Sequence, residues 1–135
     1  MSKKFIAGGC SFTFGHELSD DQEGKVPSKK SWAHLLKEKQ QLTMAERIKA
    51  SSTHPIHPKD PSLALEYICT AHPGSGNSGI ARRIFNRVAY AKDVEAVVVM
   101  WSFLSRYDWA MSRHTALEDT RWATISPWDT HIKDN

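Results

Sequence analysis

Three short apolar segments, joined by two amphipathic stretches, constrain the fold of this chain most strongly. The apolar segments are residues 4–8, 65–69 and 96–101, and each has a length typical of a β-strand. The stretches between them carry apolar residues at helical spacing. Strands that alternate with helices predict a parallel sheet with helices on both faces. We therefore expect an α/β fold with three layers, α/β/α, around a flavodoxin-like parallel sheet.

Two helices are predicted between the strands. Ser31 is the expected N-cap of the first, with Ser28 as an earlier alternative. This helix reaches about residue 41, and its pattern can extend to residue 50. The proline-containing residues 51–61 are expected to be irregular. The apolar stripe of the first helix is Trp32, Leu35 and Leu36, and that of the second, which ends near residue 91, is Ile80, Ile84, Phe85 and Val88.

The third predicted strand leaves one edge of the sheet unexplained. Residues 96–101 are apolar on both faces, as in a central parallel strand. A flavodoxin-like sheet places a fourth strand beside it, yet residues 109–122 are mixed in polarity and favour a helix. We expect this edge to be covered by a second copy or another protein chain, by a further C-terminal part, or by residues 103–135. The chain is predicted to be a single domain over residues 1–135, incomplete at its C-terminal side if it is the N-terminal part of a longer domain.

Composition argues against several functional classes. The formal net charge of the 135 residues is +3, and the sequence contains no long run of like charges. Nucleic-acid binding is therefore not a favoured function. No apolar stretch predicts a membrane span or a signal peptide. We therefore expect a cytoplasmic protein in which Cys10 and Cys69 are free thiols. His54 and His57 are separated by proline and joined by no cysteine or carboxylate cluster, so neither a metal nor another cofactor is expected.

Ser11 is the candidate nucleophile. It follows the first predicted strand on a turn of small residues. Loops 72–79 and 101–108 follow the other two strands, and the sites of open α/β sheets lie at the carboxyl ends of their strands. A serine hydroxyl placed there can attack an acyl group, while its backbone N–H helps to bind the oxyanion. A purely structural serine in a tight turn is the alternative.

Residues 9–13, Gly-Cys-Ser-Phe-Thr, resemble the first block of the SGNH (GDSL-like) hydrolase superfamily in its phage-type form. Residues 31–36 are similar to the same relatives. Residues 73–77 resemble the glycine block of this family, and residues 101–106 match the phage-type third block with Trp-Ser and a following Arg. The Asn of the general family's third block is absent. The resemblance covers about residues 4–110 and implies an SGNH-like fold.

The resemblance also implies roles for the matched residues. Ser11 would be the nucleophile, and Gly74, or alternatively Gly76, would donate its N–H to the oxyanion. Asn77 would add a side-chain amide, although an asparagine before an apolar stripe also suits a helix N-cap.

Two further residues are implied in the third block. Ser102 and Arg106 would contact the oxyanion or an anionic group of the substrate. Arg106 can equally form an exposed ion pair with Asp108 or Asp20.

The catalytic base is the open question in the sequence. The family carries an Asp-x-x-His block, whereas residues 128–131 read Trp-Asp-Thr-His, which is one residue shorter. His131 is the candidate base on this comparison. His16 and His72 lie near the predicted site and are alternatives, although surface histidines in loops are common.

The sequence therefore favours a serine ester hydrolase. Its expected substrates are small acyl esters or acylated carbohydrates, and its expected mechanism passes through an acyl-enzyme on Ser11. The alternative is a non-catalytic SGNH-fold module of a phage, used for binding or assembly and associated with the virion. Nucleotide binding at the glycine-rich loop is a weaker alternative, because no Walker-type Gly-Lys-Ser/Thr is present. Trp32 and Trp101 are expected in the core, while Trp109, Trp122 and Trp128 are candidates for covering the open edge or for binding a sugar or a partner.

Overall fold

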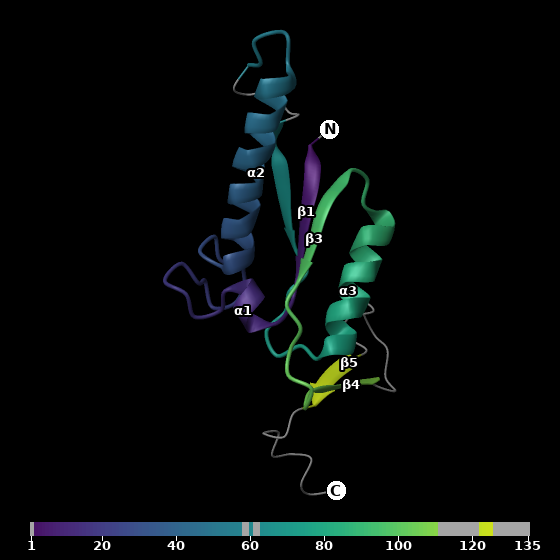
Figure 1. The fold of residues 1–135 in the computed structure, drawn as a ribbon. Helices are drawn as coiled ribbons and strands as arrows, with labels where there is room; N and C mark the ends of the chain where they lie inside the picture. Colours follow the sequence, from purple (N-terminus) through teal and green to yellow (C-terminus); the bar gives the residue numbers. More distant parts are fainter. Residues whose placement is uncertain (1, 58–59, 61–62, 111–121, 126–135) are drawn as a thin grey trace, which may run out of the picture.

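The structure, a computed structural model, describes residues 2–57, 60, 63–110 and 122–125 (Figure 1). Its elements, in chain order, are β1 (Lys3–Gly8), α1 (Ser11–Phe14), α2 (Trp32–Ser51), β2 (Leu65–Cys69), α3 (Asn77–Tyr90), β3 (Val94–Val99), β4 (Tyr107–Ala110) and β5 (Trp122–Ile125). The three strands and two long helices predicted from the sequence are all present, and the fold is α/β.

A three-stranded parallel sheet forms the centre of the fold. Its order is β2-β1-β3, so β1 pairs with both of the other strands. Ile6, in the middle of β1, lies opposite Ile68 on one side and Val97 on the other. The two crossovers run in opposite directions along the sheet, and crossovers of one hand then place their helices on opposite faces. Figure 1 shows α2 and α3 on opposite sides of the sheet.

The core on the α2 side is built around one residue from each of three elements. Phe5 of β1, Met44 of α2 and Leu65 of β2 are all buried and form one cluster. The half-buried side chains packed against this cluster are Ile48, Tyr67, Ala96 and Val98.

The core on the α3 side depends on close packing of the helix against β1. Ile6, Ile80 and Ile84 are buried. A Cβ added to Gly8 would lie 2.2 Å from Cδ1 of Ile84, so the end of β1 has no room for a larger side chain. This contact fixes where α3 crosses the strand from which the Ser11 turn departs.

The start of α2 is as predicted, but its buried face is not. Ser31 is the N-cap, and its side chain accepts a hydrogen bond from the His34 N–H. The predicted stripe of Leu35 and Leu36 is wrong, because these side chains are 52% and 40% exposed. The helix instead buries Ala33 and Met44, which lie on a different face of the same 20-residue helix.

The prediction of a fully covered third strand is also wrong for the described part of the chain. In the three-stranded sheet β3 is an edge strand, with Val97 41% exposed. The predicted core residue Trp101 lies just beyond β3 and is 57% exposed. Within the described ranges, the edge of β3 that faces away from β1 therefore has no neighbouring strand.

A second, separate sheet follows β3. Strands β4 and β5 pair antiparallel, with Tyr107 opposite Ile125 and Ala110 opposite Trp122. The prediction of a helix over residues 109–122 is therefore wrong at both of its ends, where the chain forms strands. Residues 111–121 lie outside the described residues. Cys10 and Cys69 are free thiols, as expected, the first buried and the second half-buried.

Candidate active site at the carboxyl end of the sheet

Ser11 is the first residue of α1, three positions after the end of β1. Cys10 precedes it with an extended backbone and is the N-cap, but its side chain makes no capping hydrogen bond. The helix has only four residues and ends at Gly15, whose φ of 80° is in the left-handed region that glycine tolerates best. The sequence therefore forms a sharp strand-to-helix turn with the serine at its tip.

Gly9 makes this turn possible because the helix folds back onto it. A Cβ added to Gly9 would lie 2.1 Å from Oγ1 of Thr13 and 3.1 Å from the Met100 carbonyl oxygen. Thr13 is completely buried. The Gly-x-Ser-x-Thr spacing of residues 9–13 thus has a steric cause: glycine at position 9 leaves space for the threonine beneath the serine.

The hydroxyl and the N–H of Ser11 differ from its carbonyl in having no hydrogen-bond partner among the described residues. Its carbonyl accepts from the N–H groups of Gly15 and His16, at 2.8 and 3.1 Å. Within the described ranges, no residue is a hydrogen-bond partner of its hydroxyl, and no acceptor faces its N–H. The side chain is half-buried. A half-exposed hydroxyl beside an N–H without an acceptor is compatible with an acyl-transfer nucleophile, which also needs a base.

The loops that follow all three strands meet at the end of β1. The Thr70 N–H donates to the Ala7 carbonyl at 2.8 Å, and the His72 N–H donates to the Gly9 carbonyl at 3.2 Å. On the other side, the Met100 N–H donates to the Gly8 carbonyl at 3.0 Å. The structure therefore brings the glycine-rich loop and the segment after β3 to either side of the Ser11 turn, as the sequence predicted.

Gly74 and Gly76 occupy different environments within the glycine-rich loop. Gly74 is exposed, with φ of 80°, and a Cβ built on it would meet nothing within 4 Å. Gly76 is buried and is the N-cap of α3. Ser75 lies between them, and its buried hydroxyl donates to the His72 carbonyl at 2.7 Å.

Asn77 joins the start of α3 to the segment after β3. Its Nδ2 donates to the Ser102 carbonyl at 3.3 Å, and its Oδ1 accepts from the Ser102 N–H at 2.7 Å. Gly76 is the N-cap of this helix, so the alternative prediction of Asn77 as N-cap is wrong. Asn77 is instead the first helical residue, and its amide holds the neighbouring loop in place.

Ser102 also connects Asn77 with Arg106. The Arg106 Nη1 donates to the Ser102 hydroxyl at 3.0 Å, and the guanidinium lies 5.4 Å from the centre of the Phe103 ring. Asn77, Ser102 and Arg106 therefore form one connected polar group, although the expected ion-pair partners of Arg106 are engaged elsewhere. Asp20 accepts from the Ser28 hydroxyl and from the Lys29 N–H.

Asp108 has a structural role that the sequence did not indicate. Its Oδ2 accepts a short hydrogen bond from the Gly79 N–H in the first turn of α3. A Cβ added to Gly76 would lie 2.8 Å from Oδ1 of the same carboxylate. A carboxylate at a helix N-terminus is stabilising because it satisfies free N–H groups. The 29 residues between Gly79 and Asp108 explain why no local pattern revealed the contact.

Two of the three candidate histidines, His16 and His72, are among the residues that the structure describes. The Nδ1 of His16 lies 3.1 Å from Oδ2 of Asp21. The Glu17 and Gly24 N–H groups donate to Asp21 at 2.8 and 2.9 Å, and these hydrogen bonds, with the nearby His16, lower the pKa of its carboxyl. His72 is exposed, and its Nδ1 lies 2.9 Å from the Pro73 carbonyl. His131 lies outside the described residues.

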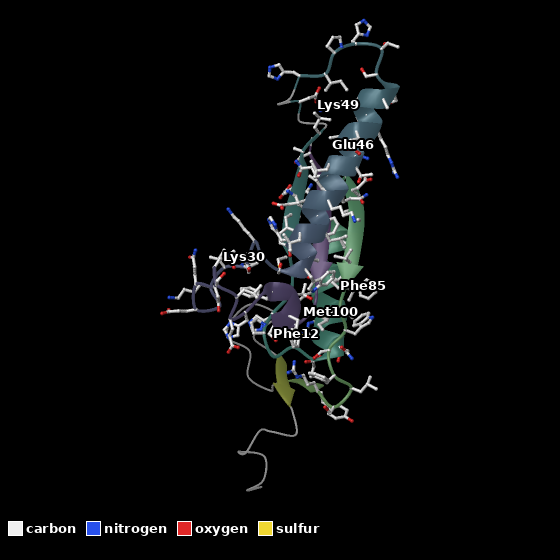
Figure 2. All side chains as sticks on the ribbon, turned by 60° about the vertical axis from the view of Figure 1, so that its left-hand side comes forward. Phe12, Lys30, Glu46, Lys49, Phe85 and Met100 are labelled. Atoms are coloured by element: carbon white, nitrogen blue, oxygen red, sulfur yellow. The ribbon has the colours of Figure 1, made fainter. Side chains whose placement is uncertain are left out.

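Exposed apolar side chains surround the Ser11 turn. Phe12 is 64% exposed, and Met100 and Trp101 are 39% and 57% exposed. Figure 2 shows Phe12 on α1 and Met100 just beyond β3, at the same end of the sheet. An apolar surface beside a nucleophile can hold an acyl chain.

No group of three or more His, Cys, Asp or Glu side chains in the part of the chain that the structure describes is placed to hold a metal ion. No helix there combines the length and the apolar character that crossing a membrane requires.

Comparison with known proteins gave no relatives. Family models, curated proteins and solved structures were each compared with the chain, and none matched.

Proposed function

We propose that this protein is a serine ester hydrolase in which Ser11 is the nucleophile. The supporting observation is the position of Ser11, half-buried at the tip of the turn after β1, with a hydroxyl that no described residue engages. The likeness of residues 9–13 to the first block of SGNH hydrolases points to the same residue. The exposed Phe12, Met100 and Trp101 suit an apolar acyl group, so the proposed substrates are small acyl esters or acylated carbohydrates.

The proposed reaction has two steps. In the first, Ser11 Oγ attacks the acyl carbon, its proton passes to a base, and the bond from the acyl carbon to the alcohol oxygen breaks as the alcohol takes that proton. In the second, a water molecule attacks the acyl-enzyme, releases the carboxylic acid and restores the Ser11 hydroxyl. The tetrahedral oxyanion of each step accepts from the Ser11 N–H and from the Gly74 N–H.

Asn77, Ser102 and Arg106 act around this centre in the proposal. The Asn77 amide is bonded to the Ser102 backbone, so Asn77 is best assigned to holding the loops at their positions. Arg106, which donates a hydrogen bond to the Ser102 hydroxyl, supplies positive charge for an anionic part of the substrate.

The base that takes the Ser11 proton is His131 in this proposal, by its likeness to the family's final block. His16 is the competing assignment. Its ring is already paired with Asp21, and a carboxylate that orients an imidazole is the usual support of a catalytic histidine. Its N–H also donates to the Ser11 carbonyl, which keeps the two residues close along the backbone.

Hydrolysis of p-nitrophenyl acetate and p-nitrophenyl butyrate tests the proposal. Ser11→Ala should reduce turnover to the uncatalysed background, whereas Ser78→Ala, which removes an exposed hydroxyl from α3, should leave it unchanged. His131→Gln and His16→Gln identify the base, because only one of them should abolish turnover. Asp21→Asn should weaken turnover only if His16 is that base. Equal turnover in the wild type and Ser11→Ala would refute serine catalysis.

A non-catalytic binding module is the second candidate, and one observation favours it. In the described part of the chain no histidine ring is hydrogen-bonded to the Ser11 hydroxyl, and an unassisted serine is a weak nucleophile at neutral pH. Binding of an acylated sugar with equal affinity by the wild type and Ser11→Ala, without turnover, would support this function.

A further inference from the structure

A groove lies between the end of β2, with the residues that follow it, and α3. It has a volume of about 430 Å³. Its lining residues are Cys69, Thr70, Ala71, His72, Arg83, Asn86, Arg87 and Tyr90. We call it the β2–α3 groove. Because β2 is an edge strand, the groove opens along the side of the sheet opposite β3.

The charge of the β2–α3 groove has one sign. Two arginines and a histidine line it, and none of its lining residues is an aspartate or a glutamate. Arg83 and Arg87 are four residues apart on α3, so their side chains lie on the same side of the helix. A groove lined by guanidinium groups without carboxylates favours an anionic ligand.

The two arginines differ in how firmly they are held. The Nε of Arg83 donates to the Thr70 carbonyl at 3.0 Å, and its Nη2 donates to the Ser75 hydroxyl at 2.5 Å. Arg83 is thereby fixed against the end of β2. Arg87 is exposed, and no interaction with another described residue engages its guanidinium. Arg87 is therefore the group in this groove that can bind a ligand without breaking an internal contact.

The remaining lining residues add neutral binding groups. Asn86 carries an exposed amide, and Tyr90 is 89% exposed, so its ring is free to stack on a flat ligand. Cys69 does not add negative charge, because burial raises the pKa of its thiol.

A purely structural explanation for Arg87 is available, and it makes a different prediction. Arg87 lies in the last turn of α3, where a cation is favourable near the negative end of the helix dipole. That role affects the stability of the helix but confers no binding. It also does not account for Arg83 and His72 lining the same groove.

We propose that the β2–α3 groove binds the phosphate monoester of a small organic molecule. A guanidinium matches the oxygens of a phosphate, and two arginines with a histidine suit a dianion better than a single carboxylate. The groove falls within the range of about 300–1,000 Å³ typical of ligand sites, and it is much larger than a phosphate ion alone. Tyr90 accommodates the organic part of the ligand. The proposal is independent of catalysis by Ser11.

Calorimetric titration of the full chain with adenosine monophosphate, inorganic phosphate and adenosine tests this proposal. Adenosine monophosphate provides both a phosphate monoester and a flat ring. It should bind saturably, inorganic phosphate more weakly, and adenosine not measurably. Arg87→Ala should weaken the binding of adenosine monophosphate by about tenfold or more, because a charge-assisted hydrogen bond is lost.

Arg47→Ala is the matched control. Arg47 is an exposed arginine on α2, so its loss changes the net charge equally without touching the groove. It should leave the affinity within about twofold, since charges beyond a Debye length of about 8 Å are largely screened at physiological salt. Arg87→Gln repeats the test with a side chain of similar length if Arg87→Ala lowers the melting temperature. Absence of saturable binding, equal binding of adenosine, or equal losses in the two alanine variants would overturn the proposal.

Discussion

Asn77 and Ser102, 25 residues apart, are joined by two hydrogen bonds between the Asn77 amide and the Ser102 backbone. One amide thus satisfies both the donor and the acceptor of a backbone unit in an irregular segment. Because the segment follows β3 and the helix follows β2, this contact sets the relative position of two of the three loops at the candidate site.

Replacing Asn77 should therefore reduce stability. Asn77→Ala leaves the part-buried Ser102 N–H and carbonyl without these partners, which should cost about 1–3 kcal/mol. Asn77→Asp keeps the acceptor for the Ser102 N–H and places a negative charge in the first turn of α3, so it should cost less. Thermal unfolding of the three proteins measures the difference. Equal melting temperatures for the wild type and Asn77→Ala would contradict this role.

Gly9→Ala should destabilise the Ser11 turn. The added Cβ would lie 2.1 Å from Thr13 Oγ1. Overpacking of this kind typically costs about 1–3 kcal/mol. Thr13→Ala in the same background removes the Oγ1 contact but keeps the Cβ of residue 13, which lies 2.6 Å from the added atom, so the double variant should recover only part of the lost stability. Denaturant unfolding of both single variants and the double variant gives the coupling energy. A coupling energy of zero would mean that the two residues do not constrain each other.

The loop before α2 should lose stability in acid through Asp20. Its pKa lies below the ordinary value of 3.8, because the Ser28 hydroxyl and then the Lys29 N–H donate to the carboxylate. A lowered folded-state pKa means that the carboxylate stabilises the protein above about pH 3.8, and that this contribution is lost as the pH falls through the folded-state pKa. Asp20→Asn should lower the melting temperature near neutral pH and have progressively less effect below pH 3.8.

Melting temperatures of the wild type and Asp20→Asn between about pH 2.5 and 7 measure this dependence. Asp93→Asn is the control, because no described residue donates a hydrogen bond to the Asp93 carboxylate. A difference between wild type and Asp20→Asn that stays constant over the whole range would show that ionisation of Asp20 is not involved.

The free edge of β3 should make the isolated chain self-associate. In the described part of the sheet, β3 pairs only with β1, and the exposed Val97, Met100 and Trp101 lie on or beside its free edge. An unpaired apolar edge is a template for a second strand, and in a solution of this protein that strand comes from a second copy. Sedimentation velocity should detect an oligomer.

Val97→Lys should shift this oligomer toward the monomer, because charge on an edge strand opposes pairing. Val26→Lys, at an exposed valine in the loop before α2, is the matched control and should have no effect. A wild-type protein that sediments as a 15.3 kDa monomer at all concentrations would contradict the prediction.

The local elements of this fold could be predicted from the sequence, but the long-range contacts could not. The strand at residues 65–69 and the helix α3, which begins after the glycine-rich loop, have clear sequence patterns, and both are present as expected. The prediction of which face of α2 is buried is wrong, because in the sequence Leu35 and Leu36 suit a buried stripe as well as Ala33 and Met44 do. Only the packing against Phe5 and Leu65 distinguishes the two faces.

The same distinction between local and long-range features applies to the candidate site. The position of Ser11 follows from the apolar strand and the small-residue turn, which are adjacent in sequence. The contact between Asp108 and the first turn of α3 has no such local signal. Neither does the pairing of His16 with Asp21, since many exposed loops contain histidine and aspartate at this spacing.

Covalent labelling of Ser11 tests the central proposal most directly. A fluorophosphonate reacts with a serine that has a base and an oxyanion site, and an ordinary surface hydroxyl is inert to it. Intact-mass and peptide analysis of the labelled wild type should show one adduct, located on Ser11, and Ser11→Ala should remain unlabelled while Ser78→Ala is labelled as the wild type is. No adduct on Ser11, or an adduct that persists in Ser11→Ala, would contradict the assignment of Ser11 as a catalytic nucleophile.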